Sequence, residues 1–96
     1  MSDSTVLEIH PRAEIAIEYL AKPVQKQILN VISFLQKQGT TNSHVKKLPD
    51  LNNLFVMQAP NNVKIIFSSE NDTMMILDVL DHDKFQRLRR LYEEIL

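Results

Sequence analysis

Residues 54–80 read LFVMQAPNNVKIIFSSENDTMMILDVL, which is three apolar runs separated by two polar breaks. The breaks, Pro60-Asn61-Asn62 and Glu70-Asn71-Asp72, contain residue types that favour tight turns. Apolar runs of this length between turn signals predict three strands. They are Leu54–Ala59, Val63–Ser69 and Thr73–Leu80. Because short turns connect them, we expect an antiparallel meander.

The apolar residues of these strands do not alternate cleanly with polar ones. Ile65, Ile66 and Phe67 are consecutive, and so are Ile76 and Leu77. A sheet with one face in water shows strict alternation, whereas a sheet covered on both faces shows continuous apolar runs. We therefore expect the middle of this sheet to be covered on both faces.

The N-terminal half predicts a strand and two helices. Val6 to Ile9 is a short apolar strand, and Pro11 suits the first turn of a helix that runs to about Leu20. A second helix starts at Pro23 and carries one apolar stripe at helical spacing. The stripe consists of Val24, Ile28, Val31, Ile32 and Leu35. It ends near Gly39, the only glycine, where a left-handed residue is favoured.

Between the second helix and the meander we expect a polar loop from Thr40 to Ser43, a short strand from Val45 to Leu48, and a turn from Pro49 to Asn53. After the meander, Asp81-His82-Asp83 offers N-cap side chains for a last helix. Its apolar stripe is Phe85, Leu88, Leu91, Tyr92 and Ile95. The predicted class is α+β. An N-terminal helical hairpin packs on a small, mainly antiparallel curved sheet, with a C-terminal helix, in one domain over residues 1–96.

Composition narrows the class of protein. There is no cysteine, so disulfides and thiolate metal sites are excluded. The polar, acidic N-terminus lacks the features of a signal peptide, and no apolar run approaches the length of a bilayer span. We therefore expect a cytoplasmic protein without membrane contact. A single glycine excludes glycine-rich phosphate loops, and no cofactor is expected.

Charge is segregated along the chain although the net charge is only -1. From Lys22 to Lys47 there are five lysines and no acid, and residues 84–96 hold four basic and two acidic residues. A surface that binds a polyanion needs local positive charge rather than a positive total. These two segments could form one such surface, or the lysines could be a solvated helix face.

The order of elements and five short segments resemble the RelE/ParE superfamily of toxins from bacterial toxin–antitoxin pairs. The resemblance covers Leu7 to Leu91. The segments are LAKPVQKQI (residues 20–28), VKKL (45–48), LFVMQA (54–59), VKIIF (63–67) and MILDV (75–79) followed by His82.

The resemblance implies an activity and a set of roles. Members that cut mRNA on the ribosome do so without metal, by attack of a 2′-hydroxyl on its own phosphodiester. That reaction needs a base, an acid and cations that stabilise the charged phosphorane. The implied catalytic positions are Lys64, His82 and Gln58. The implied RNA-binding residues are Lys46, Lys47, Lys84, Arg87 and Arg90.

Four positions depart from the pattern of the family. Gln58 stands where an arginine is common and supplies no charge, and Lys64 replaces a second arginine without its bidentate fork. The frequent His-Arg pair becomes His82-Asp83, and Phe85 occupies the neighbourhood of a tyrosine. These departures favour an alternative function, a non-catalytic or gyrase-directed member that acts by protein–protein binding.

Each candidate also has a structural interpretation. Lys64 could be a rim lysine whose stem covers apolar surface, and His82 could belong to a helix cap. Lys46 and Lys47 point to opposite faces of a strand, so at most one of them joins a given site. The arginines of the last helix could pair with Glu93 and Glu94.

The acidic cluster around His82 raises the question of a metal. Asp78, Asp81, His82 and Asp83 are close in sequence, but they lack helical ligand spacing and a second ligand pair. We therefore expect no metal.

The expected partners follow from the same resemblance. A toxin of this family would bind a cognate antitoxin in a hetero-oligomer and act on mRNA on the ribosome. A third possibility is a small interaction domain unrelated to toxins, whose helices pack against a second copy. A neighbouring gene for a short antitoxin would discriminate against this third possibility.

Overall fold

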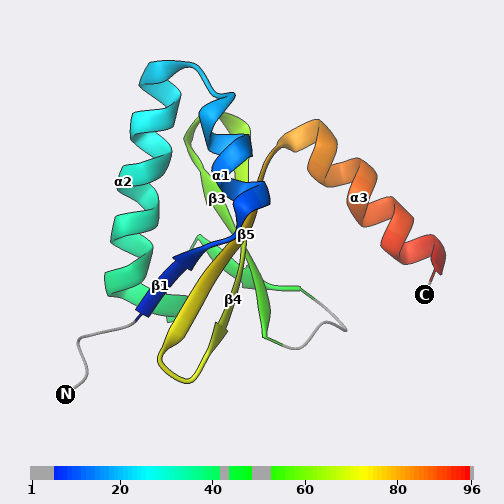
Figure 1. The fold of residues 1–96 in the computed structure, drawn as a ribbon. Helices are drawn as coiled ribbons and strands as arrows, with labels where there is room; N and C mark the ends of the chain where they lie inside the picture. The colour runs from blue at the N-terminus through cyan, green and yellow to red at the C-terminus, as the bar shows by residue number, and fades with distance from the viewer. Residues whose placement is uncertain (1–5, 42–43, 49–52, 96) are drawn as a thin grey trace.

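Five strands and three helices make up the described part of the chain in the computed structural model (Figure 1). The described residues are 6–41, 44–48 and 53–95, and for residues 41, 88, 89 and 91–95 only the backbone is described. The elements are β1 Val6–Ile9, α1 Pro11–Glu18, α2 Lys22–Gln38, β2 Val45–Lys47, β3 Leu54–Ala59, β4 Val63–Glu70, β5 Thr73–Asp81 and α3 His82–Ile95.

These elements follow the predicted order β-α-α-β-β-β-β-α, and the α+β class is confirmed. The predicted turn from Pro49 to Asn53 lies outside the described residues except for Asn53, as do residues 42 and 43 of the predicted polar loop. The stripe residues of the last helix beyond Phe85 also lie outside the described side chains.

The strands form one mixed sheet in the order β1-β5-β4-β3-β2. The meander β3-β4-β5 is antiparallel, as predicted, and β2 adds to it antiparallel to β3. At the other edge β1 pairs parallel with β5. The chain therefore crosses from one edge of the sheet to the other through α1 and α2 before it returns as β2 (Figure 1).

Local signals explain where the elements begin and end. Nδ1 of His10 accepts a hydrogen bond from the backbone N–H of Arg12 at 3.0 Å and caps α1, whose first residue is Pro11. The helix α2 begins at Lys22, so Pro23 lies in its first turn. It ends at Gly39, whose φ of 66° and ψ of -154° form a backbone conformation that glycine adopts without strain.

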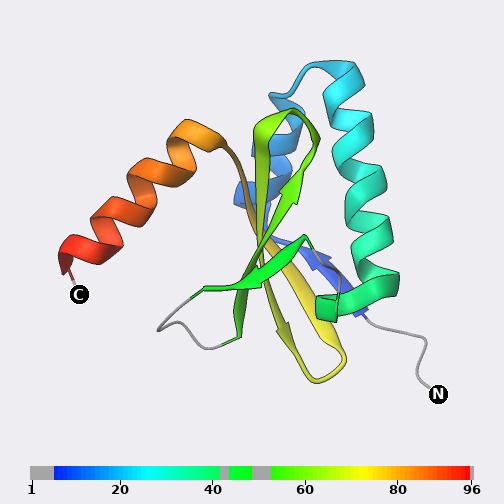
Figure 2. The same ribbon diagram turned by 180° about the vertical axis from the view of Figure 1, so that it is seen from behind.

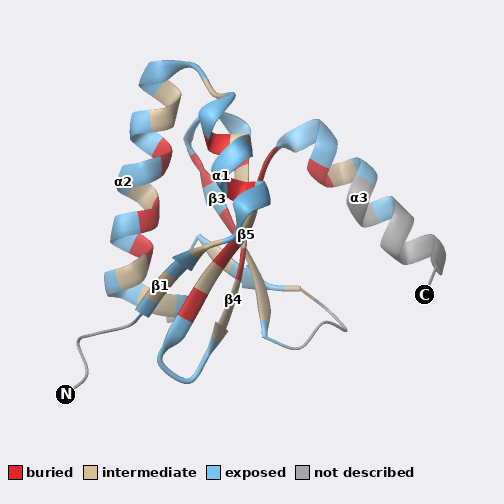
Figure 3. Cartoon of the chain, viewed as in Figure 1, coloured by how far each residue is buried: buried red, intermediate tan, exposed pale blue. Residues whose placement is uncertain are grey.

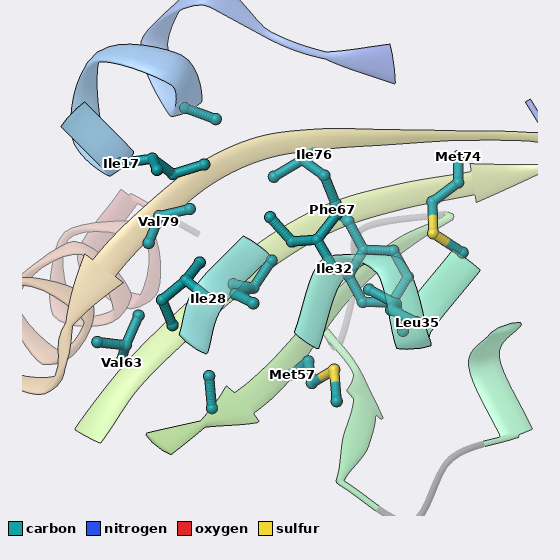
Figure 4. Close-up of a cluster of buried hydrophobic side chains, with 13 residues drawn as sticks. Ile17, Ile28, Ile32, Leu35, Met57, Val63, Phe67, Met74, Ile76 and Val79 are labelled. Carbon is teal, nitrogen blue, oxygen red and sulfur yellow. The ribbon is translucent and has the colours of Figure 1, made fainter. Parts of the chain in front are cut away.

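The hydrophobic core lies between the helix pair and one face of the sheet (Figures 3 and 4). α1 and α2 contribute Ala13, Ile17, Ile28, Ile32 and Leu35. The strands contribute Met57, Ala59, Val63, Ile65, Phe67, Met74, Ile76 and Val79. At the centre the rings of Phe55 and Phe67 stack across β3 and β4, with 5.5 Å between their centroids.

The prediction that the middle of the sheet is covered on both faces is wrong for the described helices. α1 and α2 lie on the same face, while the described contacts of α3 with the sheet are mainly with β5 and β4, and the helix then leads away from the sheet (Figures 1 and 2). Ile66 lies between two core residues but points to the opposite face, where it is half-buried.

A β-bulge explains the second apolar run. Ile66 pairs with Asp78 and Phe67 pairs with Ile76, so Leu77 is an extra residue in β5 without a partner in β4. The two apolar residues Ile76 and Leu77 are therefore consecutive because of the bulge, and their succession does not indicate a second covering layer.

Candidate anion-binding site

The face of the sheet opposite α1 and α2, called the open face below, carries the candidate catalytic side chains. Alternation along β4 directs Val63, Ile65 and Phe67 into the core, so Lys64 and Ile66 point to the open face. Strand register sets their neighbours. One row is Gln58, Lys64 and Leu80, and the next is Lys46, Val56, Ile66 and Asp78.

Lys64 has three neighbours that define its position. It is half-buried, and its partner in β5 is Leu80, which is 7% exposed. Its ammonium group donates a hydrogen bond to Oε1 of Gln58. Its Nζ also lies 5.8 Å from the ring centroid of Phe85 in the first turn of α3, within the range of a cation–π interaction. Lys64 is therefore held at the surface of the sheet and not beneath a helix.

Gln58 is exposed and makes two hydrogen bonds with its side chain. Besides accepting from Lys64, it donates from Nε2 to the carbonyl oxygen of Ala59 at 3.0 Å. The position where the family often has an arginine thus carries a neutral amide that contacts the neighbouring cation directly.

Lys46 and Lys47 lie on opposite faces of β2, as the alternation predicts. Lys46 pairs with Val56 and shares the open face with Lys64. Lys47 pairs with Phe55, whose ring stacks on core residue Phe67, so Lys47 points away from the open face. Of the two lysines, only Lys46 is placed to serve a site that contains Lys64.

His82 is the first residue of α3 and is exposed. The cap of this helix is Asp81, whose Oδ1 accepts from the backbone N–H of Lys84 at 2.8 Å. The imidazole of His82 is therefore not the capping group. Because His82 follows Leu80 by two residues, it lies at the end of the sheet where the Gln58–Lys64–Leu80 row is found.

The α3 cations Lys84, Arg87 and Arg90 are exposed, and no described contact joins them to Lys64. Whether the arginines pair with Glu93 and Glu94 lies outside the described side chains.

The five lysines between residues 22 and 47 do not converge on one surface. Lys22, Lys26 and Lys37 are exposed positions of α2, which packs on the opposite face of the sheet from Lys64. Only Lys46 from that segment reaches the open face. The expectation of one surface built from both basic segments is therefore wrong for these three lysines of α2.

The open face also carries an acid beside the lysines. Asp78 is half-buried in the row of Lys46 and Ile66, and its Oδ1 accepts from the backbone N–H of Val79 at 2.8 Å. Within residues 6–41, 44–48 and 53–95, no group of three or more His, Cys, Asp or Glu side chains is arranged to hold a metal ion.

Two features of the site were missed by sequence reasoning. One is the contact of Phe85 with Lys64, which joins α3 to β4. The other is the hydrogen bond between Lys64 and Gln58, which face each other across the β3–β4 turn. Gln58 and Lys64 are six residues apart on either side of a short turn, and this spacing could have predicted that the two residues pair.

No described helix is both long enough and apolar enough to cross a membrane.

Comparison with known proteins places the fold. No family model and no curated protein matches the chain. The RelB–RelE antitoxin–toxin complex of Methanococcus jannaschii is 17% identical over 84% of this chain and 96% of that chain, with a TM-score of 0.70.

Two further solved structures agree. The isolated RelE toxin of E. coli is 12% identical over 96% of this chain and 99% of that chain, with a TM-score of 0.70. The chromosomal ParDE system of P. aeruginosa is 12% identical over 83% and 98%, with a TM-score of 0.65. The chain therefore has the fold of the RelE/ParE toxins.

Proposed function

We propose that this chain is the toxin of a type II toxin–antitoxin pair and acts as a ribosome-dependent, metal-independent mRNA endonuclease. Two observations support the proposal. The chain has the RelE/ParE fold. The open face of its sheet bears a cation, Lys64, that neighbouring side chains hold in place. The second observation carries the chemistry, because a phosphoryl transition state needs fixed positive charge.

The residues of the open face would divide the work. Lys64 would donate to the phosphorane oxygens. His82 is exposed at the end of the sheet where Lys64 lies, and it would exchange a proton with the attacking or leaving oxygen. Lys46 would contact a neighbouring backbone phosphate, which positions the RNA without reading its sequence. Lys47 faces away and takes no part in this scheme.

We further propose that residues 1–96 form one toxin domain that works in the cytoplasm and is neutralised by a cognate antitoxin in a hetero-oligomer. Several structures of similar fold are toxin–antitoxin complexes, which supports such a partner for this chain. Co-expression with the product of an adjacent short gene should yield a complex that survives purification.

Induction of the chain in cells tests the proposed activity. Growth and protein synthesis should stop, and Lys64→Ala should relieve the arrest. Lys37→Ala is the matched control, since Lys37 is an exposed lysine on the far side of the sheet. Undisturbed growth with the intact protein at a confirmed expression level would contradict the proposal.

A second candidate function rests on Gln58. A neutral amide stands where catalytic relatives often carry an arginine, and among the described residues of β2 to β5 only Lys46 and Lys64 supply positive charge to the open face. This favours a non-catalytic or gyrase-directed member that acts by protein binding. In that case induction would leave mRNA intact. For a gyrase-directed member, the supercoiling of plasmid DNA isolated from the induced cells should change.

A further inference from the structure

We infer that Gln58 and Phe85 are positioning residues, which hold the ammonium group of Lys64 at one point of the open face as a fixed hydrogen-bond donor to anions. The inference deepens the proposed function, because it names what organises the site for phosphate. Its structural part stands on contacts within the chain and can be tested without RNA.

The orientation of the Gln58 amide follows from its two partners. Nε2 donates to the carbonyl oxygen of Ala59, so Oε1 is the end that faces the Lys64 ammonium. The reverse orientation would place two acceptors together at Ala59 and two donors together at Lys64. The contact with Ala59 therefore orients the Gln58 amide so that its oxygen faces the lysine.

Phe85 provides the second boundary. It is only 9% exposed and lies in the first turn of α3, where the cap made by Asp81 fixes the start of the helix. Its ring approaches the Lys64 ammonium, and Leu80 lies beside the stem of the lysine in the same row. The Phe85 ring and the Gln58 amide thus restrain the Lys64 side chain, which has four rotatable bonds.

This arrangement suits a single lysine to phosphate. An ammonium group has three donors, and Gln58 takes one of them, so two remain for phosphate oxygens. Restraint of the side chain before the substrate arrives removes part of the entropic cost of binding. A lysine lacks the planar fork of arginine, so its direction depends on such neighbours.

Nuclear magnetic resonance of the whole chain tests the restraint. A methylene group over the face of an aromatic ring is shifted upfield by the ring current, so the Lys64 Hε signals should be upfield of those of Lys37. Phe85→Leu should abolish this shift, and Phe85→Tyr should keep it. Gln58→Leu, at an exposed position, should reduce the shift and merge the two Hε signals into one.

Lys64 signals that match those of Lys37 in the wild type, or that stay unchanged in both Gln58→Leu and Phe85→Leu, would overturn the inference. Circular dichroism of each variant establishes that it is folded. Because Gln58 is exposed, its substitution keeps the test valid if Phe85→Leu does not fold.

Cleavage of mRNA on purified ribosomes is the functional arm. Gln58→Leu should lower kcat about tenfold with a smaller change in KM, below the hundredfold that can follow a displacement of about 1 Å. Gln58→Glu should keep the Lys64 signature but abolish cleavage, since a carboxylate would hold the cation and repel phosphate. A wild type that shows the signature without cleavage would leave the inference standing and overturn the proposed function.

If the wild type cleaves mRNA and Gln58→Leu cleaves at the same rate, positioning by Gln58 is overturned.

Discussion

The two faces of the sheet differ in what covers them, and β4 shows the difference from one residue to the next. Val63, Ile65 and Phe67 are buried against the helix pair, whereas Lys64 and Ile66 are half-buried on the open face. One strand thus supplies the core on one side and the candidate site on the other. Alternate positions should therefore affect stability and activity separately.

The largest effect on stability should come from the covered face. Phe67 is fully buried and stacks on Phe55 at the centre of the core. Phe67→Ala should lower the free energy of unfolding by about 3–5 kcal/mol, measured by urea denaturation, because it removes apolar contacts and leaves a cavity. Ile66→Ala, one residue away on the open face, is the control. An equal loss for Ile66→Ala would break the distinction between the faces.

A smaller loss should follow removal of the cap of α3. Asp81→Ala should cost about 1 kcal/mol of unfolding free energy, because the backbone N–H of Lys84 loses its acceptor. Asp81→Asn retains an oxygen acceptor and should cost less. If the Lys64 ring-current shift also falls in Asp81→Ala, the start of α3 controls the geometry of the open face. Unchanged stability in Asp81→Ala would show that the cap is dispensable.

A comparable loss is expected far from the open face, at the end of α2. Gly39 has a φ of 66°, and no atom lies within 4 Å of the Cβ that a substitution would add. Gly39→Ala should therefore cost about 1–3 kcal/mol through backbone strain alone, because this combination of φ and ψ is essentially confined to glycine. Gly39→Asn should cost as much, since the ψ of -154° at Gly39 lies outside the left-handed helical region that asparagine tolerates. RNA cleavage should be the same in both variants, and a selective loss of cleavage would contradict the assignment of function to the open face.

The smallest effect should separate the two lysines of β2. Lys46→Ala should weaken RNA binding modestly and reduce the slope of log affinity against log salt concentration by about 1, as expected for the loss of one phosphate contact. Lys47→Ala should change neither quantity, because Lys47 points to the other face. Equal effects of the two substitutions would mean that RNA does not lie on the open face.

Sequence patterns sufficed for the elements of the fold. Turn residues at Asn61 and Asn71, both with positive φ, marked the meander, and Gly39 marked the end of α2. These signals are local, because each depends on the backbone conformation of one or two residues. The α+β class and the order of the elements followed from them.

The parts that sequence could not supply depend on contacts between distant residues. The parallel pairing of β1 with β5 joins segments more than 60 residues apart, and nothing in Val6 to Ile9 specifies it. Leu77 looked like a core residue but is the extra residue of a bulge. The lysines of α2 and Lys46 belong to one basic segment of the chain, yet the crossover places them on opposite sides of the sheet.

For the candidate site, alternation separated Lys46 from Lys47 correctly, but it could not show what holds Lys64. The contact with Phe85 arises only because α3 starts at the end of β5 and brings its first turn against the row of Leu80. Such a contact is set by the packing of one element on another, which no local pattern records.

The rate of mRNA cleavage on purified ribosomes, compared for wild type and Lys64→Ala at equal stability, is the most direct test of a functional open face. Loss of the Lys64 ammonium should lower kcat by about 10²–10³-fold, the usual effect of removing one donor to a developing oxyanion. Cleavage by Lys64→Ala at the wild-type rate would contradict a catalytic role for this face.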